Sequence, residues 1–173
     1  MISTRKIVYL AFLTAISIVL TRFLSIRLPM AGVESIRIGF GGLPIILAGV
    51  AFGPLAGGLV GFISDLVGYF INPMGAYMPH FTLTSALTGI IPGLVVFYLF
   101  RQKRTFWTLL VAIGIGQGIT SVVLVPYFLQ SLFLVPIKAT IIPRMIGQLI
   151  HIPLYTYLSM VLINNKAINL TKD

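Results

Sequence analysis

Long hydrophobic runs, separated by short polar or Gly/Pro-containing stretches, fill most of the 173-residue sequence. Six runs can be marked, at residues 7–24, 39–52, 54–71, 81–100, 106–129 and 139–163. Most approach the length of about 20 residues at which an α-helix crosses the hydrocarbon core of a bilayer. The alternating ten-residue segments of a transmembrane β-barrel are absent from the sequence. The pattern predicts an all-α integral membrane protein, a six-transmembrane-helix bundle forming a single domain over residues 1–173.

The second run is shorter than the others and ends at Phe52-Gly53-Pro54. Glycine followed by proline breaks regular structure, so the second and third runs should meet at an abrupt hinge. We expect them to form a tight hairpin that does not cross the membrane in a straight line. No internal repeat is visible, which argues against a carrier built from inverted repeats.

Composition agrees with a membrane location, since 58% of the residues are hydrophobic, only 9% are charged, and the mean hydropathy is +1.05. The net charge is +9, but the cations are scattered at the ends of the runs and form no basic stripe. Nucleic acid is therefore a poor candidate partner. Cysteine is absent, which excludes disulfides and sulfur metal sites. Arg5 and Lys6 precede a run too long for a signal peptide, so that run is interpreted as an uncleaved first span.

The Lys and Arg residues near the span ends favour cytoplasmic N- and C-termini, by seven against five. The inner set is Arg5, Lys6, Arg101, Lys103, Arg104, Lys166 and Lys172, and the outer set is Arg22, Arg27, Arg37, Lys138 and Arg144. The outer cations could attract an anionic ligand, which we favour, or could snorkel to lipid phosphates. The outer connections would be residues 25–38, 72–80 and 130–138, of which the first is long enough to form a lid.

The connection that leads into the fourth run combines helix-breaking residues with side chains that stack on flat ligands. These side chains are Tyr77, Met78, His80 and Phe81. A ligand-facing loop and a membrane-interface belt explain them equally well. Thr82, Thr84, Ser85 and Thr88 follow inside the run, but such hydroxyls usually bond to their own helix backbone and are weak evidence of a site.

Only three carboxylates occur: Glu34, Asp65 and Asp173. Asp65 lies well inside the third run, where an ionised group needs a partner. Arg37 is the best candidate, and a structural ion pair is the favoured interpretation. The alternative is that Asp65 accepts hydrogen bonds from a ligand.

A polar stripe marks the sixth run, where Arg144, Gln148, His151 and Tyr155 recur at spacings of 4, 3 and 4 residues. These spacings place the four side chains on one helical face. A shorter stripe on the fifth run holds Gln117 and Ser121, beside Gly114, Gly116 and Gly118. Interhelical hydrogen bonds could explain each stripe alone, but their joint occurrence favours a cavity between the two helices.

Small residues recur at helical spacing in two places. Ala11 and Ala15 stand four apart in the first run, and Gly57, Gly58 and Gly61 cluster in the third. Such faces allow close helix packing, either inside the bundle or against another membrane protein.

Signatures of catalysis are missing: the sequence has no HExxH, GxSxG or Walker A motif and no carboxylate pair. A metal at His80 or His151 is improbable without neighbouring acidic or thiol ligands. We therefore expect a protein that is not an enzyme, has no cofactor of its own, and has no evident means of powering transport.

At this point the residues resemble a known family, the substrate-binding S components of energy-coupling factor (ECF) transporters, and within it the folate-type branch. The resemblance is carried by Ala11/Ala15, Arg37-Ile-Gly-Phe-Gly41 with Pro44, Phe52-Gly53-Pro54, Gly61 to Asp65 with Gly68, and Gly75-Ala-Tyr77 with Pro79 and Phe81-Thr-Leu-Thr84. It covers about the first 95 residues closely and the remainder in pattern.

The resemblance implies a protein that captures a vitamin outside the cell and docks on a transmembrane coupling (T) subunit with two ABC ATPases, which use the ATP. Ala11 and Ala15 would face the coupling subunit. The outer loops and the outer halves of the last three helices would form the vitamin pocket.

For folate, Arg27, Lys138 and Arg144 suit the anionic tail, and aromatic and amide side chains suit the rings. The candidate substrate-binding residues are Arg27, Arg37, Asp65, Tyr77, His80, Phe81, Thr84, Gln117, Arg144, Gln148 and His151. Related branches that share the GAY-P-FTLT stretch bind pyridoxine-type or hydroxymethylpyrimidine ligands, so the resemblance leaves these as alternative ligands. His80 stands where relatives with the FTLT motif have glycine, a departure that bears on the depth of the pocket and the identity of the ligand. A membrane scaffold subunit that binds no ligand is the alternative from another functional class.

Overall fold

The computed structural model of the protein describes residues 4–30, 33–73 and 77–164, with the backbone alone described for the strand residues between 26 and 38. Gly75, Lys166, Lys172 and Asp173 lie outside the described residues, as do the side chains of Arg27, Glu34 and Arg37.

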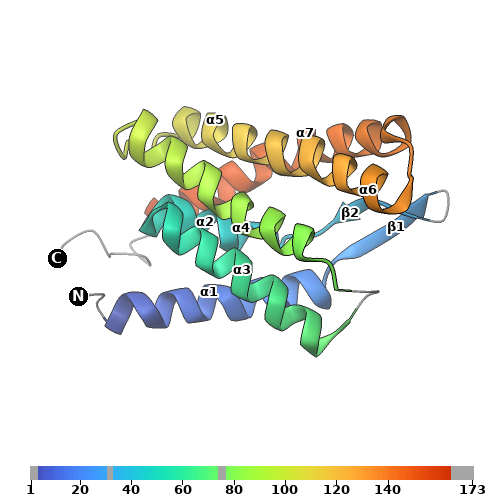
Figure 1. Ribbon diagram of the computed structural model, residues 1–173. Helices are drawn as coiled ribbons and strands as arrows, with labels where there is room; N and C mark the ends of the chain where they lie inside the picture. The colour runs from blue at the N-terminus through green and yellow to red at the C-terminus, as the bar shows by residue number, and fades with distance from the viewer. Residues whose placement is uncertain (1–3, 31–32, 74–76, 165–173) are drawn as a thin grey trace.

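Six helical rods form the fold (Figure 1), and they lie within a few residues of the six hydrophobic runs. The first three are α1 (Thr4–Arg22), α2 (Gly42–Phe52) and α3 (Pro54–Ile71). The fourth is α4 (Pro79–Leu94) with the π-helical η1 (Val95–Leu99), the fifth is α5 (Phe106–Gln117), η2 (Gly118–Leu124) and α6 (Val125–Phe133), and the sixth is α7 (Ile137–Asn164). Five rods are long and apolar enough to cross a membrane, and α2 is the shorter one.

The connection between α1 and α2 differs from the purely helical expectation. It forms an antiparallel hairpin of β1 (Ile26–Met30) and β2 (Val33–Ile38), in which Arg27 stands opposite Arg37. Apolar residues alternate with other residues along β1, which is the two-residue period of a strand. The segment expected to act as a lid is therefore a hairpin.

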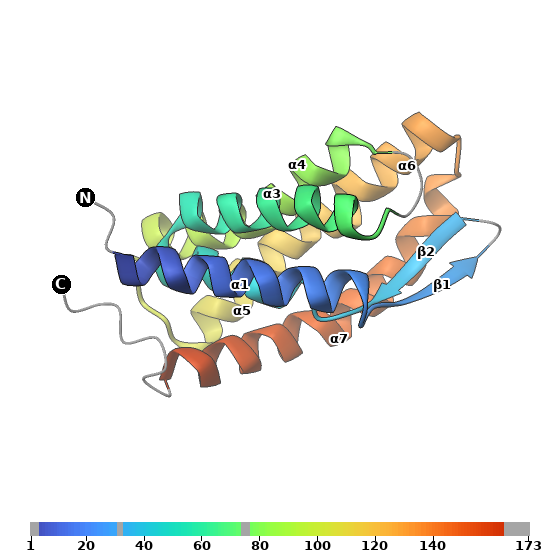
Figure 2. The same cartoon turned by 90° about the horizontal axis from the view of Figure 1, so that it is seen from below.

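The connections sort to two ends of the bundle. Figures 1 and 2 show that α1 begins and α7 ends at one end, whereas the hairpin and the turn between α6 and α7 lie at the other. We call the second end the hairpin end.

Helix α2 occupies the centre of the bundle, and every residue from 44 to 51 is buried. It joins α3 through Gly53, whose φ of 103° lies in the region that favours glycine. The predicted sharp hinge at Phe52-Gly53-Pro54 is confirmed.

Glycines let α2, α3 and α4 cross in close contact. A Cβ at Gly57 would lie 2.6 Å from the Cα of Gly49, and a Cβ at Gly49 would overlap the carbonyl oxygen of Gly89. A Cβ at Gly61 would overlap the carbonyl oxygen of Ser85. The small-residue cluster of the third run therefore serves packing inside the bundle.

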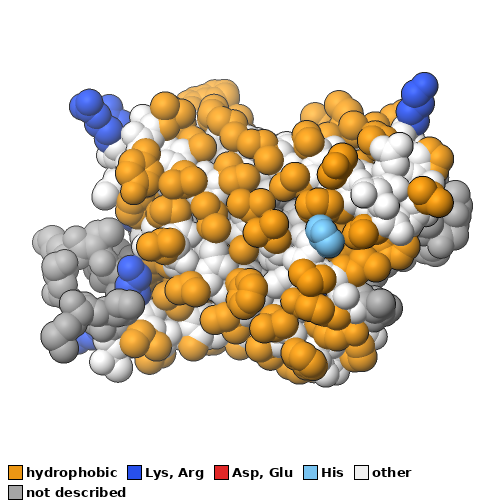
Figure 3. Space-filling model, viewed as in Figure 1, with side chains coloured by type: hydrophobic (Ala, Val, Ile, Leu, Met, Phe, Trp, Pro, Cys, Tyr) orange, Lys and Arg blue, Asp and Glu red, His pale blue; other side chains and the backbone are white. Residues whose placement is uncertain are grey.

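Hydrophobic side chains dominate the face seen in Figure 3, and Lys and Arg side chains lie at its two ends. Large apolar side chains are strongly exposed, among them Leu55 on α3 and Leu149 on α7. Tyr98 and Trp107 are also exposed and flank the turn between η1 and α5. An apolar surface with charges at its ends is the arrangement expected of a bilayer-embedded bundle.

Candidate functional site

A cavity of about 180 Å³ lies between the base of the hairpin and the helices α1, α2, α4, α5 and α7. Its walls come from segments far apart in the sequence. They include Thr21 and Ser25 next to the hairpin, Gly42 at the start of α2, Thr84 on α4 and Gln148 on α7.

The polar stripe on α7 forms one wall of this cavity. Arg144, Gln148, His151 and Tyr155 all line it, which confirms that they share one helical face. The His151 and Tyr155 rings lie side by side, with centroids 5.4 Å apart and planes tilted by 31°. The wall therefore offers a cation, an amide and two flat rings.

The shorter stripe also lines the cavity and meets the first stripe through an interhelical hydrogen bond. Gln117 and Ser121 both line the cavity, and the Gln148 Nε2 donates a hydrogen bond of 2.8 Å to the Ser121 Oγ. The Gln148 Oε1 is buried, and no donor among the described residues reaches it. A buried acceptor of this kind needs a donor, which a ligand in the cavity could supply.

The π-helical segment η2 carries Thr120 and Ser121 into the cavity wall. It begins at Gly118, where an added Cβ would meet no heavy atom within 4 Å. It ends two residues before the buried Pro126, which has no N–H for a regular helical bond. π-helical turns inside helices occur frequently at functional sites.

The hydroxyls of α4 contribute a third wall. Thr84 donates to the His80 carbonyl oxygen at 2.8 Å, and Thr88 donates to the Thr84 carbonyl oxygen at 2.9 Å. As predicted, these hydroxyls are satisfied by their own helix, yet both residues line the cavity. Their oxygen atoms still have lone pairs with which to accept hydrogen bonds.

A cationic side chain, Arg144, lines the cavity, and none of the described lining residues is Asp or Glu. A guanidinium in this wall can donate charge-assisted hydrogen bonds to an anionic group of a ligand.

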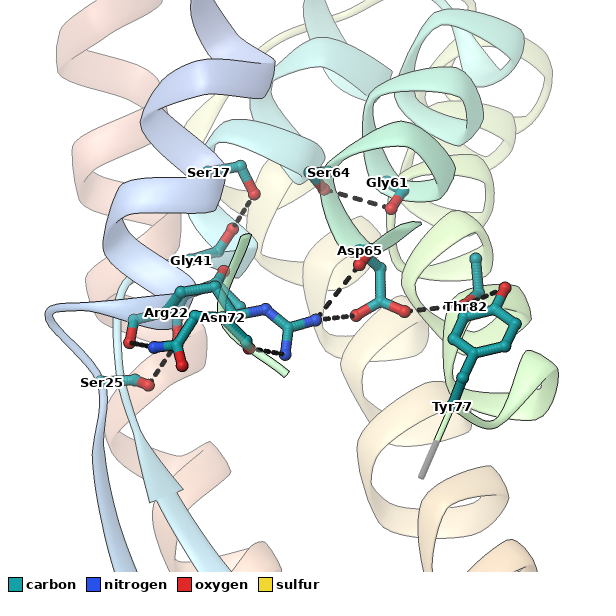
Figure 4. Close-up of polar contacts among 11 residues, drawn as sticks. Ser17, Arg22, Ser25, Gly41, Gly61, Ser64, Asp65, Asn72, Tyr77 and Thr82 are labelled. Carbon is teal, nitrogen blue, oxygen red and sulfur yellow. Dashed lines mark hydrogen bonds and ion pairs between the residues drawn. The ribbon is translucent and has the colours of Figure 1, made fainter. Parts of the chain in front are cut away.

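Asp65 lies in a different polar cluster, which Figure 4 shows between α1, α3 and the start of α4. Its Oδ1 is 3.2 Å from the Arg22 Nη2, and its Oδ2 accepts a hydrogen bond of 2.7 Å from the Thr82 Oγ1. The favoured interpretation of a structural ion pair is supported, with Arg22 as the partner that the structure shows. The side chain of Arg37, the expected partner, lies outside the described residues.

The choice of Arg22 has a physical reason. Arg22 ends α1, which packs along α3, and its side chain crosses α3 at Gly68, where a Cβ would lie 2.9 Å from the guanidinium Nε. The Nη2 also donates to the Asp65 carbonyl oxygen at 3.1 Å. A cation near the C-terminal end of a helix also interacts favourably with the helix dipole.

The aromatic residues of the connection into α4 lie outside the cavity wall. The Tyr77 and Thr82 hydroxyls are hydrogen-bonded at 3.1 Å, so Tyr77 belongs to the Asp65 cluster. The His80 ring is exposed and lies 5.1 Å from the Phe128 ring of α6, and Phe81 is partly buried at the start of α4. Ligand contacts for Asp65, Tyr77, His80 and Phe81 stay predictions, as do those for Arg27 and Arg37.

Several lining residues were not predicted from the sequence. Ser17, Thr21 and Ser25 recur every four residues, a stripe like that of α7, and the last two line the cavity. This four-residue spacing could have identified them from the sequence. Gly39, Gly41 and Gly42 also line the cavity, but glycines give no sequence signal for a backbone wall.

Comparison with known proteins gives concordant matches. A family model described as the S component of ECF-type riboflavin transporters matches residues 1–160. A folate transporter FolT from Clostridium novyi is 38% identical over 148 residues, which cover 86% of this chain and 81% of that protein. A folate transporter FolT from Leuconostoc mesenteroides subsp. mesenteroides is 30% identical over 175 residues, covering 98% and 90%.

Solved structures share the fold. The crystal structure of FolT bound with folic acid superposes with a TM-score of 0.77 at 25% identity, covering 99% of this chain and 96% of the other. The structure of an S component of a bacterial ECF transporter superposes with a TM-score of 0.62 at 22% identity and shows the same fold.

Proposed function

We propose that this chain, which belongs to the ECF-type riboflavin transporter S component family, is the folate-binding subunit of an ECF transporter in the cell membrane. Two similar proteins that cover most of its length are folate transporters, and a FolT structure with folic acid has a similar fold. These likenesses support folate as the ligand within a family whose name refers to riboflavin.

The observation that carries the proposal is that Arg144 lines the cavity together with amide and aromatic side chains. Folate carries a glutamyl tail with two carboxylates, whereas riboflavin, pyridoxine and hydroxymethylpyrimidine carry none. A charge-assisted hydrogen bond to a carboxylate is about twice as strong as a neutral one. Arg144 therefore favours folate over the uncharged vitamins.

The size of the cavity supports a particular placement of the ligand. Its volume of about 180 Å³ lies below the range of roughly 300–1,000 Å³ for pockets that enclose a drug-sized ligand. We place the flat pterin deep in the cavity, beside Gln117, Gln148 and His151, where amide groups can pair with its donor and acceptor edge. The glutamyl tail then extends past Arg144 toward the hairpin end.

Family membership implies association with an ECF transporter complex. In our proposal the partners are a transmembrane coupling subunit and two ABC ATPases, the ATPases use the ATP, and this chain performs no catalysis and needs no cofactor. Both chain ends face the cytoplasm, so the hairpin end receives folate from outside. Ala11 and Ala15 are exposed on α1, where a coupling subunit could pack against them.

Calorimetric titration of the purified protein in detergent tests the proposed ligand, after carried-over ligand has been washed out. Folate, riboflavin, pyridoxine and hydroxymethylpyrimidine are titrated separately. We expect one-to-one binding of folate at least 100-fold tighter than that of the other three, since a charge-assisted bond contributes about 1.5–3 kcal/mol and the rings add to it. Tighter binding of an uncharged vitamin, or no folate binding by a folded sample, would overturn the assignment.

A further inference from the structure

The turn between the hairpin and α2 forms part of the cavity wall with its backbone. Gly39, Gly41 and Gly42 line the cavity. A Cβ at Gly39 would lie 2.8 Å from the Ser25 Cβ, and a Cβ at Gly41 would overlap the Thr21 side chain. The base of the hairpin is therefore seated directly on the end of α1.

Two hydroxyl groups from different helices bond to the backbone of this turn. The Tyr155 hydroxyl of α7 donates a hydrogen bond of 2.6 Å to the Gly39 carbonyl oxygen, which lies 116 positions away in the chain. The Ser17 hydroxyl of α1 donates a hydrogen bond of 2.9 Å to the Gly41 carbonyl oxygen. Tyr155 is 4% exposed and Ser17 is fully buried, and the Ser17 bond is buried whereas the Tyr155 bond, at the cavity wall, is partly buried.

Tyr155 differs from Ser17 because it also forms part of the binding surface. Its ring lines the cavity next to His151, and a Cβ at Gly42 would lie 3.5 Å from the Tyr155 Cε2. One rigid side chain thus touches the ligand space with its ring and the base of the hairpin with its hydroxyl. A ligand that packs on the ring restricts its motion and thereby favours the hydrogen bond to Gly39.

We propose that Tyr155 is a positioning residue that fixes the hairpin base against α7 and couples occupancy of the cavity to the order of the hairpin. The two effects are thermodynamically linked. If ligand binding stabilises the Tyr155–Gly39 hydrogen bond, this hydrogen bond must stabilise ligand binding by the same free energy. A wall held in place before binding spares the ligand the cost of ordering it. The ligand's identity rests on the proposed function, but the hydrogen bond and its effect on the free protein do not.

Hydrogen–deuterium exchange of the backbone around residues 38–46 tests the coupling, with the protein reconstituted in nanodiscs with and without folate. Tyr155→Phe keeps the ring and removes the hydroxyl. Tyr157→Phe is the matched control, because Tyr157 lies two residues further along α7 and is 61% exposed. Folate dissociation rates are measured on the same samples.

In the wild type and in Tyr157→Phe, we expect folate to slow exchange in this segment at least ten-fold. In Tyr155→Phe, exchange without folate should be several-fold faster and the protection by folate should shrink. Folate should dissociate about 3- to 10-fold faster, as expected for the loss of one hydrogen bond, while the association rate changes less than three-fold. Ser17→Ala should speed exchange in the free protein while leaving the protection by folate largely intact.

A purely structural role of Tyr155 would lower the unfolding temperature and raise exchange throughout the bundle, with protection by folate unchanged at residues 38–46. That result would overturn the proposal, as would a Tyr155→Phe variant identical to the wild type. If Tyr155→Phe does not fold, the test rests on Ser17→Ala. Unchanged hydrogen–deuterium exchange of residues 38–46 in that variant would contradict the claim that buried hydroxyls fix the hairpin base. Absence of folate binding in the wild type contradicts the proposed function instead, and the exchange of the free proteins still tests the hydrogen bond.

Discussion

Asp65 shows how this protein keeps a carboxylate within a membrane-embedded helix. Its two oxygens have separate partners, the Arg22 guanidinium and the Thr82 hydroxyl, and those partners belong to α1 and α4. The side chains of Arg22 and Asp65 are 8% and 18% exposed. Three helices are therefore joined near the hairpin end by one largely buried polar cluster.

Asp65→Ala should destabilise the protein without abolishing folate binding. Removing one member of a buried ion pair costs about 3–5 kcal/mol, and because Asp65 is partly exposed we expect about 2–3 kcal/mol. The measurement is the thermal unfolding midpoint in detergent, together with the folate dissociation constant. The double variant with Arg22→Met and Asp65→Leu should recover much of the stability, because neither charge is then left alone.

Folate affinity of Asp65→Ala should stay within a few-fold of the wild type, since Asp65 does not line the cavity. Lost folate binding at unchanged stability would instead place Asp65 at the ligand.

At the level of single residues, the sequence predicted which polar side chains share a helical face, but it did not predict the ion-pair partner of Asp65. Arg144, Gln148, His151 and Tyr155 were predictable because helical periodicity fixes which side chains share a face. The need of Asp65 for a cation followed from its position in an apolar run. Its partner did not, because the choice of Arg22 depends on how α1 crosses α3 at Gly68.

Among the helices of the bundle, α2 is the least like a membrane span, although most of its residues are buried. It is too short to cross a bilayer, yet it lies buried at the centre, where its Gly49 meets Gly57 of α3 and Gly89 of α4. Arg104 donates a hydrogen bond of 3.0 Å to the Ala51 carbonyl oxygen, and the Lys6 Nζ donates one of 3.3 Å to that of Phe52. Two cations thus satisfy carbonyl groups at the C-terminal end of α2.

Gly57→Ala should be strongly destabilising, because its methyl group would meet backbone atoms of Gly49 and Gly89 that cannot move independently. Overpacking of a core costs about 1–3 kcal/mol, and we expect the upper part of that range here. Gly118→Ala is the control, since no heavy atom lies within 4 Å of the added Cβ and its backbone φ is −57°. Thermal unfolding of both variants checks the prediction, and equal midpoints would refute the crossing as described.

The six helical segments were predictable, because most of their hydrophobic runs are long and Gly53-Pro54 marks a sharp turn between two adjacent runs. The hairpin was not, since its alternation extends over only a few residues on each strand. The π-helical form of η2 also has no periodic signature in the sequence.

At the scale of the whole molecule, the cavity and the exposed apolar face of α1 lie in different parts of the protein. The cavity lies next to the base of the hairpin, while α1 presents an apolar face that includes Ile7, Ala11, Phe12 and Ala15. The glycine cluster of α3 is used inside the bundle, but the two alanines of α1 are exposed and remain available for a partner. Ligand capture and docking are thus assigned to separate parts of the protein.

The double variant Ala11→Trp/Ala15→Trp should prevent docking on the coupling module, because two indole rings would hold another helix away from this face. Folate binding should be unchanged, as neither residue lines the cavity. Co-purification with the coupling subunit and ATPases, and folate uptake by proteoliposomes, measure the effect. Leu149→Trp is the control, placed on the exposed surface of α7. Normal assembly and uptake by the double variant would disprove the assigned docking face.

The most direct test of the central claim compares the folate affinity of the wild type, Arg144→Ala and Lys103→Ala by calorimetry. Arg144 lines the cavity, whereas Lys103 is exposed in the turn between η1 and α5 and does not line it. Loss of a hydrogen bond to a charged group costs about 1.5–3 kcal/mol, so Arg144→Ala should bind folate about 10- to 150-fold more weakly, and Lys103→Ala should bind like the wild type. Unfolding midpoints confirm that each variant is folded. Unchanged folate affinity in a folded Arg144→Ala variant would show that this cavity does not hold the vitamin's anionic end, and would contradict the account.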